Sequence, residues 1–72
     1  MVTTTAQSAS QVQSALRQSP IPALRKLSVR ETDEAVTLLG RVASYYIKQL
    51  AQETVMGFLS NRELHNEIIV VP

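Results

Sequence analysis

The chain of 72 residues contains no cysteine and no tryptophan, a single histidine and only two glycines. Without cysteine it can form neither a disulfide framework nor a thiolate metal site. One histidine cannot hold zinc unless several carboxylates join it. The sequence also lacks the glycine-rich loops, G-x-x-x-x-G-K and G-x-G-x-x-G, that hold nucleotide phosphates. We therefore expect no metal, no cofactor and no catalytic centre.

An excess of charge of one sign and long apolar runs are missing as well. Seven Lys and Arg against six Asp and Glu give a formal net charge of +1. The basic residues are scattered along the chain, whereas a nucleic-acid binder needs them clustered. No run approaches the ~20 apolar residues that a membrane-spanning helix requires. We expect neither a nucleic-acid partner nor a membrane-spanning segment.

The composition is that of one small folded domain, because 44% of the residues are hydrophobic and 18% are charged. Residues 1–9 show no apolar period, so we expect a flexible tail there and a domain over residues 10–72. The tail lacks the basic start and apolar core of a signal peptide. The chain is therefore expected in the cytoplasm if it is complete, and in the cell envelope or periplasm if it belongs to a longer exported protein.

The first half of the sequence predicts a helix and a β-hairpin. Ser10 is a suitable N-cap for a helix over residues 11–18, which the following Ser-Pro-Ile-Pro segment ends. Alternating apolar residues predict a strand over residues 24–31 and a second strand over residues 36–42, antiparallel to the first. The polar turn between them carries three carboxylates, which we expect to be solvated rather than to bind a cation: Glu31, Asp33 and Glu34.

The second strand leads into the main helix. Gly40 lies inside the strand, where glycine marks a bulge or a close approach of the packed helix. Ser44 is the expected N-cap of a helix over residues 45–59. Apolar residues three and four positions apart predict its buried face, together with one threonine: Ile47, Leu50, Ala51, Thr54, Val55 and Phe58.

A third strand is predicted over residues 62–71, with Leu64, Ile68 and Val70 facing the helices. Asn66 interrupts this apolar row, and we expect its amide to bond a neighbouring loop backbone and fix the register. His65 points the other way and is expected to be exposed. The predicted fold class is α+β, in the order α-β-β-α-β, with two helices on one face of a three-stranded mixed sheet. The third strand is expected beside the first.

The spacing of these residues resembles that of the BON domain, a module named after bacterial osmotically induced periplasmic and nodulation-related proteins. The resemblance covers roughly residues 12–71 and departs from the family at Glu34 and at Ser60-Asn61, where glycine and Gly-Val are usual. The motif positions are Val36, Leu38, Gly40, Val42, Ser44, Lys48, Ala51, Leu64, Asn66, Ile68 and Val70.

This resemblance implies a non-catalytic module of the bacterial envelope that binds phospholipid, often attached to channels, secretion components or osmotic-stress proteins. The candidate contact residues are Tyr45 and Tyr46, whose rings suit a membrane interface, with Arg41 and Lys48 beside them. The alternative for the tyrosines is that one packs on the hairpin and the other is merely exposed.

Other function classes stay open. An assembly module would use an edge strand or the open sheet face, which carries polar and charged side chains: Arg30, Thr37, Arg41, His65 and Glu67. A small-ligand or ion sensor would need a convergent pocket, which no motif specifies. The expected partner is therefore a membrane phospholipid surface or a protein, and the sequence leaves the oligomeric state open.

Overall fold

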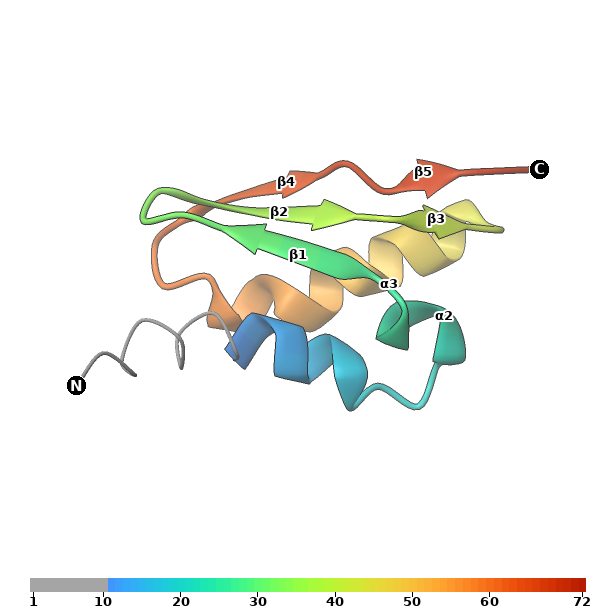
Figure 1. Ribbon diagram of the computed structural model, residues 1–72, viewed down its shortest axis with the longest axis horizontal. Helices are drawn as coiled ribbons and strands as arrows, with labels where there is room; N and C mark the ends of the chain where they lie inside the picture. Colours follow the sequence, from blue (N-terminus) through green and yellow to red (C-terminus); the bar gives the residue numbers. More distant parts are fainter. Residues whose placement is uncertain (1–10) are drawn as a thin grey trace.

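The computed structural model describes residues 11–72 and shows helices gathered on one face of a sheet (Figure 1). Residues 11–17 form the first helix. The predicted tail over residues 1–9 and the predicted cap at Ser10 lie outside the described residues. The order of elements and the single α+β domain with a mixed sheet confirm the predicted fold class.

A short second helix, α2 (Pro22–Arg25), follows the first. The expected strand over residues 24–31 is therefore wrong in its first half, since β1 covers only Ser28–Glu31. Pro22 lies in the first helical turn, where its fixed φ favours a helix and its missing N–H costs nothing. The turn is closed by the Leu24 amide, which donates to the Ile21 carbonyl at 3.0 Å.

The central strand of the sheet is β2 (Ala35–Leu39), which pairs with β1 antiparallel and with β4 (Glu63–Asn66) parallel. The order β1-β2-β4 shows that the expected position of the third strand beside the first is wrong. The main helix acts as a crossover, so that the chain returns in the direction of β2. β2 takes the central position, and its inward side chains, Val36 and Leu38, are fully buried.

Two short strands, β3 (Arg41–Val42) and β5 (Ile69–Val70), continue this parallel pairing. The register does not slip, because the same offset relates Leu38 to Asn66 and Arg41 to Ile69. The Ile69 amide donates to the Gly40 carbonyl at 2.8 Å and so bridges the interruption. The second and third strands predicted from the sequence are thus each divided in two.

The first division falls at Gly40, whose φ of +142° is a conformation that side-chain-bearing residues rarely adopt. A Cβ atom there would lie 2.6 Å from Cδ2 of Leu27. The close approach predicted at this glycine exists, but its partner is Leu27, between α2 and β1, and the expected contact with the main helix is wrong. The glycine allows the start of the hairpin to pack directly on the second strand.

The main helix, α3 (Tyr45–Val55), is continued by a 3₁₀ turn, η1 (Met56–Phe58). Its predicted cap is confirmed, since Ser44 Oγ accepts a hydrogen bond from the Ile47 amide at 3.2 Å. Ala51 and Val55 are fully buried, as predicted. Phe58 is 41% exposed and does not belong to the buried face. The tighter 3₁₀ turn changes the angular spacing of side chains after Val55.

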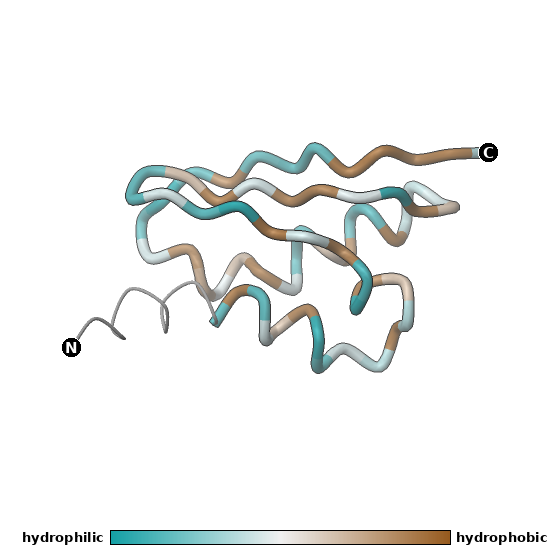
Figure 2. The backbone as a smooth tube through the Cα atoms, viewed as in Figure 1, coloured by the Kyte–Doolittle hydropathy of each residue, from teal (hydrophilic) through white to brown (hydrophobic). Residues whose placement is uncertain are grey.

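The hydrophobic core fills the space between the helices and the sheet, and Figure 2 shows hydrophobic residues distributed over both. Ile68 is 1% exposed, and Leu64 packs against the core, as predicted. Val70 is 37% exposed, so its expected burial is wrong. It lies on the last strand, where β5 has a neighbour on one side only. The core residues are Val12, Leu16, Leu24, Leu27, Val36, Leu38, Val42, Ala51, Val55 and Ile68.

Candidate functional site

The junction between β3 and α3 carries the four contact residues predicted from the sequence. Arg41 is exposed on β3, while its neighbour Val42 turns inward and is buried. Tyr45 and Tyr46 begin α3, and each is 68% exposed. The alternative in which one tyrosine packs on the hairpin is therefore wrong. Lys48 is half-buried in the first turn of the helix.

The first turn of α3 is tied to the sheet through Asn66. Its Nδ2 atom donates to the Lys48 carbonyl at 3.1 Å and to Oε1 of Gln52 at 3.3 Å. Its Oδ1 accepts from the Ile68 amide at 3.3 Å. The expected hydrogen bond to a neighbouring loop backbone is confirmed, because Ile68 lies in the loop between β4 and β5 (Ile69–Val70), and the bond to a helix carbonyl is an addition that the sequence did not predict. Asn66 thereby fixes where the start of α3 lies relative to β4.

Exposed large apolar side chains gather near the same junction. Two of them, Ile69 and Val70, lie on β5 directly across from Arg41 and Val42 of β3. Ile69 is 55% exposed. The candidate contact residues named from the sequence do not include these two. The signal that could have found them is the run from Ile68 to Val71, because consecutive apolar residues on a strand cannot all face one side.

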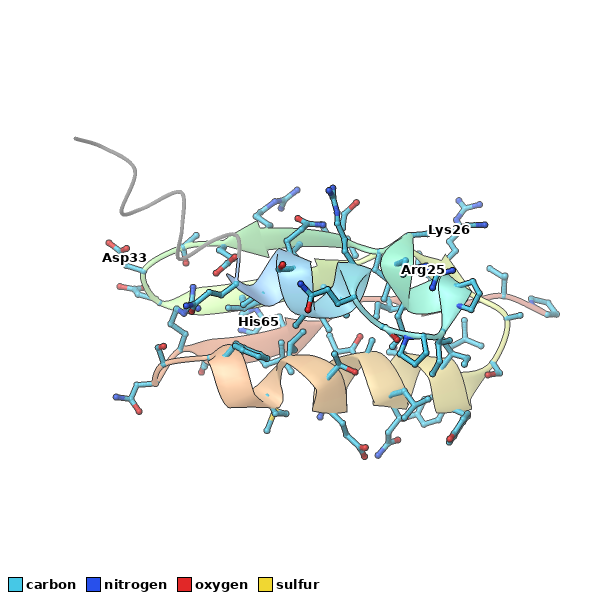
Figure 3. All side chains as sticks on the ribbon, turned by 90° about the horizontal axis from the view of Figure 1, so that it is seen from below. Arg25, Lys26, Asp33 and His65 are labelled. Carbon is cyan, nitrogen blue, oxygen red and sulfur yellow. The ribbon has the colours of Figure 1, made fainter. Side chains whose placement is uncertain are left out.

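The hairpin between β1 and β2 forms the opposite, acidic end. Figure 3 shows Asp33 at one end of the molecule, with Arg25 and Lys26 toward the other. Asp33 and Glu34 are exposed, as expected for a solvated turn. Glu31 differs, because its carboxylate lies 2.6 Å from Nη1 of Arg62 and its side chain is only 9% exposed. The expectation of a solvated carboxylate is wrong for Glu31.

Arg62 holds this end of the molecule together. Its Nε atom donates to the Leu59 carbonyl at 2.7 Å, and its Nη2 atom donates to the Phe58 carbonyl at 3.1 Å. The guanidinium thus joins the end of η1 to β1. Because the Glu31 carboxylate is paired with Arg62, it is not free to bind a cation.

The described residues offer little chemistry beyond surface contact. His65 is 47% exposed and lies 3.0 Å from the Glu63 carboxylate, so the predicted exposed histidine is confirmed. Among residues 11–72, no group of three His, Asp or Glu side chains is arranged to hold a metal ion. In the same part of the chain, none of the helices has the length and apolar character needed to cross a bilayer.

Comparison with protein-family models decides the family, because the model described as the BON domain matches residues 4–72. The chain belongs to the BON domain family. This is a family of binding modules and not of enzymes. No curated protein and no solved structure matched the chain.

Most motif positions of this BON domain build the scaffold. Buried apolar side chains, the helix cap, the glycine at the Leu27 contact and the Asn66 amide account for most of them. Leu64 is half-buried and packs against the core, whereas Val70 and the side chain of Lys48 are the exceptions. The buried motif residues are Val36, Leu38, Val42, Ala51 and Ile68.

Proposed function

We propose that this BON domain binds the surface of a phospholipid membrane and attaches its parent protein there, in the cell envelope. The observation that carries the proposal is the pair Tyr45 and Tyr46, each 68% exposed at the start of α3. A tyrosine combines an apolar ring with a polar hydroxyl, which suits the headgroup region of a bilayer. Arg41 and Lys48 lie in the same short segment and match anionic headgroups.

The expected binding is weak. Each basic residue close to an anionic surface contributes ~1 kcal/mol, and salt screens this attraction within a Debye length. The amino-terminal end of α3 adds a partial positive charge at the same place. Two side-chain charges and a helix end do not hold a domain permanently, so stable attachment requires several tethered copies.

Chemical-shift mapping with anionic bicelles tests the proposal. Tyr45, Tyr46 and Lys48 are expected to shift, and the shifts are expected to shrink in high salt. Zwitterionic bicelles serve as the reference for the electrostatic part. Shifts confined to the open sheet face, with Tyr45 to Lys48 silent, would contradict the proposal.

A matched pair of variants separates the tyrosines from exposed aromatic residues in general. The double change Tyr45→Ala and Tyr46→Ala is expected to abolish the bicelle response. Phe58→Ala removes an exposed aromatic ring from the other end of α3–η1. It is expected to leave binding unchanged, and equal losses in both proteins would speak against the tyrosine site.

A protein partner on the open sheet face is the second candidate function. The strand register places Arg30, Thr37 and His65 in one row across β1, β2 and β4. The helices lie on the other face of the sheet (Figure 1). This row gives a partner both charge and hydrogen-bonding groups. A domain that ignores anionic bicelles but loses partner binding on Arg30→Ala would favour this function.

Strand addition at the edge of β5 has less support. The Ile69 and Val71 amides donate to β3 and its preceding glycine, so alternation turns the amides of Ile68 and Val70 toward the open edge. The Ile68 amide already donates to Asn66 Oδ1. Pro72 has no amide hydrogen to offer. An incoming strand would find few free donors here.

A further inference from the structure

Resting on the proposed function, we infer that the domain meets an anionic bilayer end-on, through a tip surface built from three elements and one residue that follows a fourth. The tip surface is defined by seven residues from this end of the molecule: Arg41 of β3, Tyr45, Tyr46 and Lys48 of α3, Ile69 and Val70 of β5, and Lys26, which follows α2. The acidic hairpin then points away from the membrane. Neither Lys26 nor Ile69 belongs to the sequence motif.

Lys26 is brought to this end by the contact between Leu27 and Gly40. The Leu27 Cα atom lies 3.7 Å from the position that a Cβ would take on Gly40. Lys26 precedes Leu27 and Arg41 follows Gly40, and both basic residues are exposed. Two cations far apart in the sequence therefore lie near each other. Figure 3 shows Lys26 toward the end of the molecule opposite Asp33.

Arg25 adds a fixed charge behind Lys26. Its Nη1 atom donates to the Ser19 carbonyl at 3.0 Å, which holds the guanidinium close to the domain. Arg25 is exposed as a residue. Arg25 therefore contributes to the positive potential of this end, but its guanidinium is held by the Ser19 carbonyl and cannot move to bind a lipid headgroup.

The apolar part of the tip surface comes from β5. Ile69 pairs with Arg41 and is 55% exposed, and Val70 pairs with Val42 and is 37% exposed. Figure 2 shows this apolar segment at the opposite end of the sheet from the polar hairpin. Apolar side chains flanked by cations are the pattern that inserts into the headgroup region of anionic membranes.

The distribution of carboxylates sets the orientation. Asp33 and Glu34 are exposed at the hairpin, and the Glu63 side chain at the same end of the sheet is 80% exposed. A negative surface potential attracts the basic end and repels the acidic end. Since a domain lying flat would bring both ends to the membrane, the end-on orientation is favoured.

The charge part of the inference is tested by sedimenting the full chain with phosphatidylglycerol-containing vesicles in about 0.1 M salt, where the Debye length is about 10 Å. Lys26→Gln is expected to weaken binding about fivefold, the effect of one basic residue at the surface. Arg30→Gln removes the same formal charge from an exposed position in the middle of β1. It is expected to weaken binding less than about twofold, because charges beyond a Debye length are screened.

The apolar part is tested with Ile69→Thr and Met56→Gln. The two parent side chains are equally exposed, at 55% and 53%, but Met56 lies at the far end of α3. Thr keeps a strand preference and Gln keeps a helix preference, so both variants are expected to fold. Ile69→Thr is expected to lower vesicle binding severalfold and Met56→Gln to leave it unchanged. Urea unfolding of each variant confirms that a lost response is not lost structure.

The outcomes distinguish this inference from the proposed function. Larger losses for Lys26→Gln and Ile69→Thr than for their controls support the tip surface. Equal losses within either pair, with wild-type binding intact, overturn the tip surface and leave the proposed function standing. Absence of wild-type binding to anionic vesicles overturns the proposed function and the inference together.

Discussion

Asn66 and Lys48 are joined by a hydrogen bond of 3.1 Å, in which the asparagine amide of β4 donates to a carbonyl in the first turn of α3. The carbonyl belongs to the same turn that presents Tyr45 and Tyr46 to solvent. A polar residue of the sheet thus positions the proposed contact surface without belonging to it. The Oδ1 atom of the same side chain accepts from the Ile68 amide, so Asn66 links β4, the loop before β5, and α3.

Replacing Asn66 is expected to loosen this link. Asn66→Ala removes hydrogen bonds to Lys48, Gln52 and Ile68 and should cost about 1–2 kcal/mol of unfolding free energy. A fall in the urea midpoint measures the loss. His65→Ala, an exposed change on the same strand, is expected to stay within about 0.5 kcal/mol. Similar midpoints for the two variants would show that the Asn66 bonds contribute nothing.

Gly40 and Gly57 have different surroundings, so an alanine substitution at Gly57 is a control for the same substitution at Gly40. Gly40→Ala places a Cβ 2.6 Å from Leu27 Cδ2 at a φ of +142°, and should cost about 2 kcal/mol or more. Gly57→Ala meets no atom within 4 Å. It is expected to be neutral or to stabilise by up to about 1 kcal/mol. Urea unfolding of both variants checks the contrast, and a harmless Gly40→Ala would refute the close contact.

The turn before β4 contains two residues with positive φ, Ser60 at 53° and Asn61 at 69°. Glycine adopts this conformation without the steric cost that a side chain brings. Ser60→Gly is therefore expected to stabilise the domain by about 0.5 kcal/mol after the greater entropy of the unfolded chain is included. Ser28→Gly, in β1, should destabilise it instead. Thermal unfolding of the two variants tests the sign of each effect.

The Arg62–Glu31 pair is expected to be among the larger contributors at the acidic end. Arg62→Ala removes the ion pair and two hydrogen bonds to carbonyls at the end of η1, and should cost about 2–3 kcal/mol. Arg30→Ala, on the exposed side of β1, should cost less than about 0.5 kcal/mol. A double-mutant cycle of Arg62→Ala with Glu31→Ala isolates the pair. A coupling energy near zero would mean that Arg62 acts only through the carbonyls.

The sequence determined the features that depend on local spacing. The α+β class, the hairpin, the Ser44 cap and the buried positions Ala51 and Val55 follow from alternation, helical period and capping chemistry. These features involve residues within a few positions of one another, so the local sequence pattern is enough to predict them. The sequence left open whether both tyrosines are exposed, because one of them could have packed on the hairpin.

Tertiary structure decided what depends on partners distant in the chain. The place of β4 beside β2, the contact of Gly40 with Leu27, the acceptor of the Asn66 amide and the Glu31–Arg62 pair each join segments that no local period relates. The tip surface is of the same kind, because Lys26 and Ile69 approach Arg41 only when the sheet has formed. Alternation tells which side chains face the core, but strand order and packing choose their neighbours.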